Sequence, residues 1–115
     1  MKLAINTCFG GFGLSDAGMT RYLEIKGIKT FPEKGHYDTI HWLDVGQTNC
    51  ISHYDMERSD PALIQVLEEM GSAAWGDHSQ IEILDIPAGT RYRIQEYDGN
   101  EALICEVEQK WETAT

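Results

Sequence analysis

Alternating and helically spaced apolar residues predict the elements in the first quarter of the chain. Residues 3–6 alternate and predict a strand. Farther on, apolar residues recur at helical spacing between Ser15, a favourable N-cap, and Gly27, a favourable C-cap. This pattern predicts a first helix over residues 16–26.

The next segment carries weaker signals. Residues 28–31 alternate and predict a second strand, which Pro32 ends because proline has no N–H to donate to a strand ladder. Residues 40–45 predict a third strand. Residues 46–57 show no clear period, and no element is predicted for them.

The second helix has the clearest pattern in the chain. Ser59 is its predicted N-cap, Pro61 suits its first turn, and Gly71 ends it. A short extra turn is predicted over residues 72–76. The apolar face of this helix is formed by Leu63, Val66, Leu67 and Met70.

The last third of the chain predicts strands joined by tight turns. Residues 81–86 form one strand, and residues 90–97 and 101–107 flank Asp98-Gly99, a strong hairpin signal. The element order is then β-α-β-β-α-β-β-β. It predicts an α+β fold, a single small domain over residues 1–115 that has a mixed or antiparallel sheet with two helices.

The composition is that of a globular domain, with 42% hydrophobic residues. No apolar run approaches the roughly 20 residues that a membrane helix needs, and no secretory signal is visible at the N-terminus. The three widely spaced cysteines do not form a disulfide framework. The sequence therefore predicts a cytosolic protein with free thiols.

The net charge of −10 is concentrated in the second part of the chain. Residues 1–50 contain five acidic and five basic residues, whereas residues 51–115 contain fourteen acidic and four basic ones. This distribution argues against direct binding to nucleic acid, which requires basic patches. It permits docking on a basic surface of a partner. The alternative is that the charge serves solubility alone.

A run of three glycines and two phenylalanines within residues 8–15 is the main candidate site. Glycine tolerates positive φ and lets a ligand approach the backbone, and a turn that opens a helix directs free N–H groups at an anion. The aromatic rings suit stacking on a base, and Arg58 suits gripping a phosphate. The predicted ligand-binding residues are Phe9, Gly10, Gly11, Phe12, Gly13, Ser15 and Arg58.

A structural role for the same residues is the alternative. The glycines then form a tight turn, and the two phenylalanine rings anchor that turn in the core. Arg58 in this interpretation pairs with Glu57 or Asp60, because surface pairing is the commoner fate of an arginine.

Metal binding and catalysis have weaker support. His36, His41, Cys50 and His53 fall within eighteen residues, but only the second pair has ligand-like spacing, so the metal hypothesis is open and not favoured. Cys8 precedes the glycines without any hydrolase signature around it. No catalytic set is complete. The sequence therefore predicts a protein that is not an enzyme and has no cofactor.

Three blocks of the sequence resemble a family of small proteins encoded by phages and prophages. The blocks are residues 6–15 (Asn-Thr-Cys-Phe-Gly-Gly-Phe-Gly-Leu-Ser), residues 58–64 and residues 96–99. The resemblance implies a viral origin and an accessory role in the cytoplasm of the bacterial host. Small phage proteins with such roles often block host defence, some by sequestering nucleotide signals and others by binding defence proteins.

Two functional hypotheses follow. The first is a counter-defence protein that binds and sequesters a small nucleotide-type ligand without turnover, at a site that a homo-oligomer could complete. The second is an acidic protein–protein inhibitor or nucleic-acid mimic that binds a host defence protein through the acidic second part of the chain. Charge reversals among Glu96, Asp98, Glu101 and Glu106 would test this second hypothesis.

Overall fold

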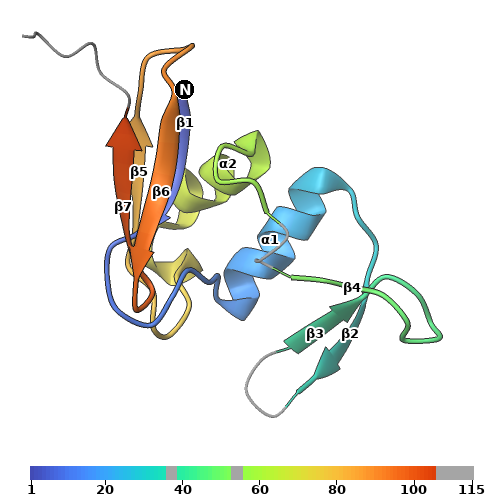
Figure 1. Ribbon diagram of the computed structural model, residues 1–115. Coiled ribbons are helices and arrows are strands. Elements are labelled where there is room, and N and C mark those ends of the chain that lie inside the picture. The colour runs from blue at the N-terminus through green and yellow to red at the C-terminus, as the bar shows by residue number, and fades with distance from the viewer. Residues whose placement is uncertain (36–38, 53–55, 106–115) are drawn as a thin grey trace, which may run out of the picture.

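The protein has an α+β fold built from two helices and seven short strands in the residues that the computed structural model describes, which are 1–35, 39–52 and 56–105 (Figure 1). In chain order the elements are β1 (Lys2–Asn6), α1 (Asp16–Lys26), β2 (Phe31–Lys34), β3 (Thr39–Trp42), β4 (Cys50–Ile51), α2 (Pro61–Met70), the 3₁₀ turn η2 (Gly71–Ala74), β5 (Ile81–Asp85), β6 (Tyr92–Tyr97) and β7 (Asn100–Cys105).

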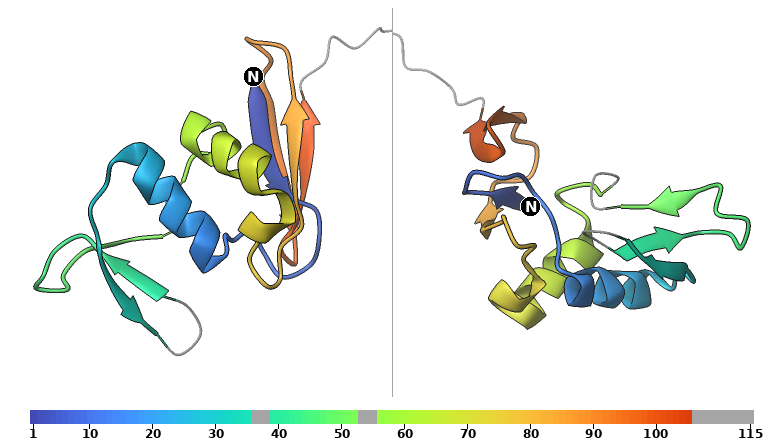
Figure 2. Two further views of the ribbon diagram at one scale, coloured as in Figure 1. Left: turned by 180° about the vertical axis from the view of Figure 1, so that it is seen from behind. Right: turned by 90° about the horizontal axis from the view of Figure 1, so that it is seen from below.

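The strands form three small sheets, all antiparallel. β1 pairs with β5, β2 pairs with β3 and β3 with β4, and β6 pairs with β7. The strands β1, β5, β6 and β7 lie together on one side of the helices, and the β2–β3–β4 sheet lies beyond α1 on the other side (Figures 1 and 2). Neither helix in the described part of the chain has the length and apolar character needed to span a bilayer.

The core lies between the two helices and β1. Ala4 of β1 and Leu63 and Val66 of α2 are fully buried members of one hydrophobic cluster. α1 adds Met19, Tyr22 and Leu23 to the same hydrophobic cluster. The apolar faces that the sequence spacing predicts for both helices therefore meet each other, which is how amphipathic helices bury their apolar stripes.

Local signals at the ends of several elements are confirmed. Ser15 caps α1 by accepting a hydrogen bond from the Gly18 N–H at 3.1 Å, and Gly27 ends the helix in the left-handed conformation. Gly71 ends α2, and a short 3₁₀ turn follows it as predicted. Asp98 and Gly99 both have positive φ, which is the geometry of a two-residue hairpin turn.

The prediction for residues 28–45 is wrong in its boundaries. The second strand begins at Phe31 rather than ending there, so Pro32 lies within it. Proline is tolerated because β2 is an edge strand and pairs only with β3. The third strand ends at Trp42, because the Asp44 carboxylate accepts hydrogen bonds from Thr48 and Asn49 and closes a loop instead.

The unassigned segment also contains a strand. β4 pairs with β3 and places Cys50 opposite Trp42. The element order is therefore β-α-β-β-β-α-β-β-β, with one strand more than predicted. In the C-terminal hairpin the first strand starts at Tyr92 rather than at residue 90, and residues 106–107 of the predicted last strand lie outside the described residues.

The N-cap of α2 is Asp60, not Ser59. The Asp60 carboxylate accepts a hydrogen bond from the Ala62 N–H at 2.9 Å, and it also accepts one from the Tyr22 hydroxyl at 2.7 Å. Partial burial acts to raise the pKa of Asp60, but these hydrogen bonds and one from Lys26 outweigh burial and hold the pKa below its ordinary value. Asp60 therefore ties the start of α2 to α1.

The Asp60 cap predicts a matched pair of outcomes. We expect Asp60→Ala to lower the free energy of unfolding by about 1–2 kcal/mol, because a cap is lost. Ser59→Ala changes only the neighbouring residue, so we expect little effect. Urea unfolding of both variants measures the difference, and equal losses would contradict the assignment.

The same cap makes a prediction about pH. The pKa of Asp60 is lower in the folded protein than in the unfolded chain. Its contribution to the free energy of unfolding is therefore fully present above the pKa of the unfolded chain, and it is lost as the pH falls through the pKa of the folded protein. The gap in stability between the parent and Asp60→Ala should therefore shrink as the pH is lowered below about 4.

Candidate functional site

The glycine-rich loop packs against the tip of the β6–β7 hairpin. The Gly10 N–H donates to the Asp98 carbonyl oxygen at 3.2 Å, and both Gly10 and Gly11 have positive φ. A Cβ atom at Gly99 would collide with the backbone of both glycines, and one at Gly10 would approach His78 to 2.6 Å. Close contact within the protein therefore requires glycine at Gly10 and Gly99, whereas at Gly11 only the positive φ favours it.

Asn6 fixes the start of the loop. Its side chain is fully buried, and its amide nitrogen donates to the carbonyl oxygens of Cys8 and Gly99, each at 2.7 Å. Its amide oxygen accepts from the Gln80 N–H at 2.9 Å. One buried amide thus joins β1, the hairpin tip and the start of β5, and its hydrogen-bonding capacity is well satisfied.

Arg58 is held by an ion pair from β7, not by Glu57 or Asp60. Its guanidinium contacts both oxygens of Glu101, with the second contact at 2.7 Å, and the Glu101 side chain is buried. The guanidinium also lies 3.8 Å from the centre of the Phe12 ring, within the range of a cation–π interaction. Two-point contact of this kind is the strongest geometry available to an arginine–carboxylate pair.

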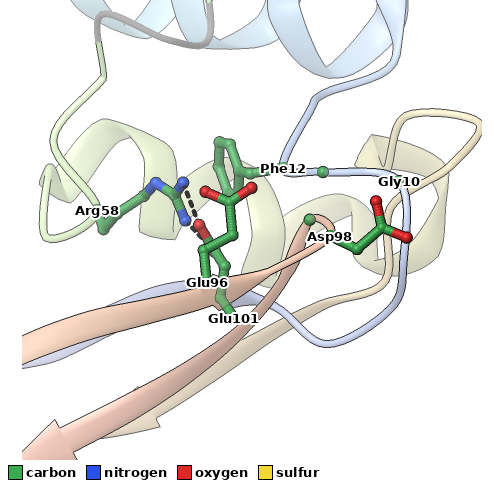
Figure 3. A pocket seen from close by; sticks show the side chains of 8 residues that line it. Gly10, Phe12, Arg58, Glu96, Asp98 and Glu101 are labelled. Carbon is green, nitrogen blue, oxygen red and sulfur yellow. Dashed lines mark hydrogen bonds and ion pairs between the residues drawn. The ribbon is translucent and has the colours of Figure 1, made fainter.

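A pocket of about 420 Å³ opens between the glycine loop and the hairpin (Figure 3). It brings together four of the seven predicted ligand-binding residues, namely Gly10, Gly11, Phe12 and Arg58. Its other lining residues are Glu96, Asp98, Gly99 and Glu101. The lining is acidic, because its charged groups are three carboxylates and one guanidinium. That guanidinium, of Arg58, is already paired with Glu101.

Phe9 lies beside this pocket. Its ring is 60% exposed and contacts the ring of Tyr97, which is 78% exposed, in an edge-to-face arrangement with centroids 6.4 Å apart. Phe9 is therefore not a core anchor, whereas Phe12 is buried. Two exposed aromatic rings in contact form a surface feature of the kind that recurs in protein interfaces.

Gly13 and Ser15 lie away from the pocket lining. The Gly13 carbonyl oxygen accepts a hydrogen bond from the Gly76 N–H at 2.9 Å. The Ser15 hydroxyl donates to the Ala73 carbonyl oxygen at 2.7 Å while it caps α1. The first residue of the helix, Asp16, is therefore three residues beyond the last glycine of the loop, and the first turn of the helix does not line the pocket.

Glu96, Asp98 and Glu101 line the pocket, although the sequence predicted them only as carboxylates of an acidic docking surface and not as neighbours of the glycine loop. A two-residue turn at Asp98-Gly99 fixes the register of the hairpin, and it places Glu96 directly opposite Glu101. Like charges at opposed positions destabilise a hairpin unless a cation lies between them. The Asp98-Gly99 turn was enough to predict that Glu96 lies opposite Glu101. It could not show which cation neutralises Glu101, because Arg58 lies 43 positions away in the sequence.

The candidate metal residues are only partly described. His41 is buried on β3, Cys50 is exposed on β4, and His36 and His53 lie outside the described residues. Within the described ranges, no group of three or more metal-binding side chains comes together. Cys8 is half-buried, and its thiol contacts the His78 carbonyl oxygen at 3.1 Å.

Comparison of the chain with protein-family models, curated proteins and solved structures finds no match. The resemblance to phage proteins stays a prediction. The chemistry of the pocket therefore carries the functional argument.

The contact between loop and hairpin makes a prediction about two glycines. Gly99 and Gly89 share a φ of 85°, but only a Cβ atom at Gly99 meets other atoms within 4 Å. We expect Gly89→Ala to cost about 1–2 kcal/mol, the strain of left-handed backbone. Gly99→Ala should cost more, because it also separates the loop from the hairpin. Equal losses in thermal unfolding would show that the contact is unimportant.

Proposed function

We propose that this protein binds a basic surface of a partner protein, without turnover, through the acidic and aromatic face beside the hairpin tip. This face, here called the hairpin-tip face, comprises Phe9, Glu96, Tyr97 and Asp98. The observation that carries the proposal is the occupation of Arg58 by Glu101, which leaves carboxylates as the available charges at the pocket.

Charge favours a cationic partner group. Within the described ranges, Glu96 and Asp98 form no ion pair, and their carboxylates point into the space between hairpin and loop (Figure 3). A lysine or arginine side chain of a partner would meet two carboxylates without displacing an existing ion pair. Surrounding acidic residues would also speed the approach of a basic partner.

The exposed aromatic pair adds an anchor. Phe9 and Tyr97 expose large apolar area at the tip of the same hairpin, where Tyr97 lies between Glu96 and Asp98 in the sequence and points to the other face of β6 from Glu96. Aromatic side chains are enriched among the residues that dominate binding energy in protein interfaces. Their rings also attract cations, so they would contribute to binding a surface that carries arginine or lysine side chains.

The nucleotide hypothesis stays a prediction, and two observations weigh against it at this pocket. A phosphate would have to compete with Glu101 for Arg58, and it would approach the negative charges of Glu96 and Asp98. In addition, the N–H of Gly10 already donates to the hairpin.

The resemblance to phage proteins implies that the partner is a bacterial host protein. A nucleic-acid-binding defence protein has the basic surface that this chemistry requires. Blocking such a surface needs only tight binding, so a protein without catalytic groups suffices.

A direct test uses the purified protein and a short arginine-rich peptide as the probe, measured by calorimetry. We expect saturable binding that weakens as salt is added, because the attraction involves exposed charges. The double variant Glu96→Gln/Asp98→Asn should bind about tenfold more weakly. Asparagine is well tolerated at positive φ in a hairpin turn, so this variant keeps the fold.

The matched control is Asp77→Asn/Glu82→Gln, which removes two exposed carboxylates elsewhere on the surface. It should bind the peptide like the parent apart from a small effect of net charge. Equally weakened peptide binding by both double variants would contradict the proposed site, because it would mean that the peptide responds only to the net negative charge of the protein. Binding of ATP or a cyclic dinucleotide in place of the peptide would favour the nucleotide hypothesis.

A further inference from the structure

The β2–β3–β4 sheet lies at one end of the molecule, beyond α1, and only one of its faces is turned toward the helices (Figures 1 and 2). On that face, the Thr39 hydroxyl donates to the Asp16 carboxylate at the start of α1 at 3.1 Å, and Ile51 packs against the core. Because side chains alternate along a strand, Ile40 and Trp42 of β3 lie on the opposite face.

This opposite face, here called the outer sheet face, comprises Phe31, Glu33, Ile40, Trp42 and Cys50. The register aligns Phe31, Trp42 and Cys50 in one row across the three strands. Phe31 is 37% exposed, Cys50 is exposed, and Trp42 is half-buried. The row therefore presents an apolar surface to solvent.

Two opposite charges flank Phe31 on this face. The Lys29 ammonium lies over the Phe31 ring, 5.6 Å from its centre, and Glu33 is two residues farther along β2 on the same side of the strand. Glu33 accepts a hydrogen bond from the Gln47 amide. Neither Lys29 nor Glu33 forms an ion pair with another described residue. The order along the chain is thus positive, aromatic, negative.

A surface with this order is complementary to itself. When a two-fold axis runs along the row, β2 of one copy lies antiparallel over β2 of the other, and Phe31 meets Phe31 of the second copy. Lys29 of each copy then lies opposite Glu33 of the other, so two ion pairs form. Packed sheets lie about 10 Å apart, a spacing that the side chains of the two rows fill.

The charge of the whole protein favours this surface over others for a second copy. At a net charge of −10, two copies repel each other. A symmetric contact through the hairpin-tip face would bring Glu96 and Asp98 of both copies together, whereas the outer sheet face pairs each charge with its opposite. The face is small, so the dimer should dissociate on dilution.

We propose that two copies of this chain associate through the outer sheet face, about a two-fold axis along the row of Phe31, Trp42 and Cys50. This surface shares no residue with the hairpin-tip face. The proposal is therefore independent of the function proposed above.

Sedimentation equilibrium of the full chain over a range of concentrations measures the association. We expect a reversible monomer–dimer equilibrium. Phe31→Ser should raise the dissociation constant about tenfold, because it removes the ring at the centre of the interface. The matched control is Ile104→Ser on β7, since Ile104 is also 37% exposed, and it should dimerise like the parent. A monomer at millimolar concentration, or equal weakening in both variants, would overturn the proposal.

Charge reversals test the symmetry of the contact. Lys29→Glu and Glu33→Lys each place like charges opposite one another across the axis, so each should weaken the dimer about tenfold. The combined variant Lys29→Glu/Glu33→Lys restores opposite charges and should dimerise like the parent. If the combined variant remains as weak as the single ones, Lys29 does not face Glu33 and the axis is wrong.

Cys50 reports on the same axis. The row places Cys50 opposite Cys50 of the second copy, across a gap of about 10 Å between the sheets. A short bismaleimide should therefore link two chains of the parent protein, and Cys50→Ser should yield no linked product. A linked dimer that persists in Cys50→Ser would refute the proposed contact, because the linkage would then come from another cysteine.

Discussion

The Glu101 carboxylate is the interaction on which the arrangement around the pocket depends. It accepts two contacts from Arg58 and a hydrogen bond from the Asn6 N–H at 2.8 Å. β7, the segment before α2, and β1 therefore meet at one buried acid. The Ala4 N–H donates to the Arg58 carbonyl oxygen at 2.9 Å, so this junction also satisfies the edge of β1 that faces away from β5.

This junction explains the character of the hairpin-tip face. Burying a carboxylate is costly unless a cation and further donors satisfy it, and Arg58 fulfils that requirement. The guanidinium is thereby held by Glu101, and in the part of the chain that the structure describes Glu96 and Asp98 form no ion pair. The glycine-rich loop, for which the sequence predicted a phosphate ligand, thus lies in an acidic pocket that suits a cation. The reason is that the fold uses Arg58 to neutralise the buried Glu101.

Features governed by neighbouring residues could be predicted from the sequence. Ser15 and Gly27 bound the first helix as expected, and Asp98-Gly99 forms the hairpin turn, because capping and tight turns depend on residues a few positions apart. The prediction that Pro32 ends a strand was wrong, because an edge strand such as β2 tolerates a proline and the sequence does not show which strand lies at the edge of a sheet. The pairing of Arg58 with Glu101 joins distant segments, and no local pattern reports it.

The central claim is that the Arg58–Glu101 pair holds the pocket together, and a double-mutant cycle tests it most directly. The variants are Arg58→Met, Glu101→Gln and their combination, compared by urea unfolding. Each single change should cost about 3 kcal/mol, because it leaves a buried group without its partner. The double variant should then cost much less than the sum of the two. Additive losses would contradict the account and mean that the two side chains stabilise the fold independently.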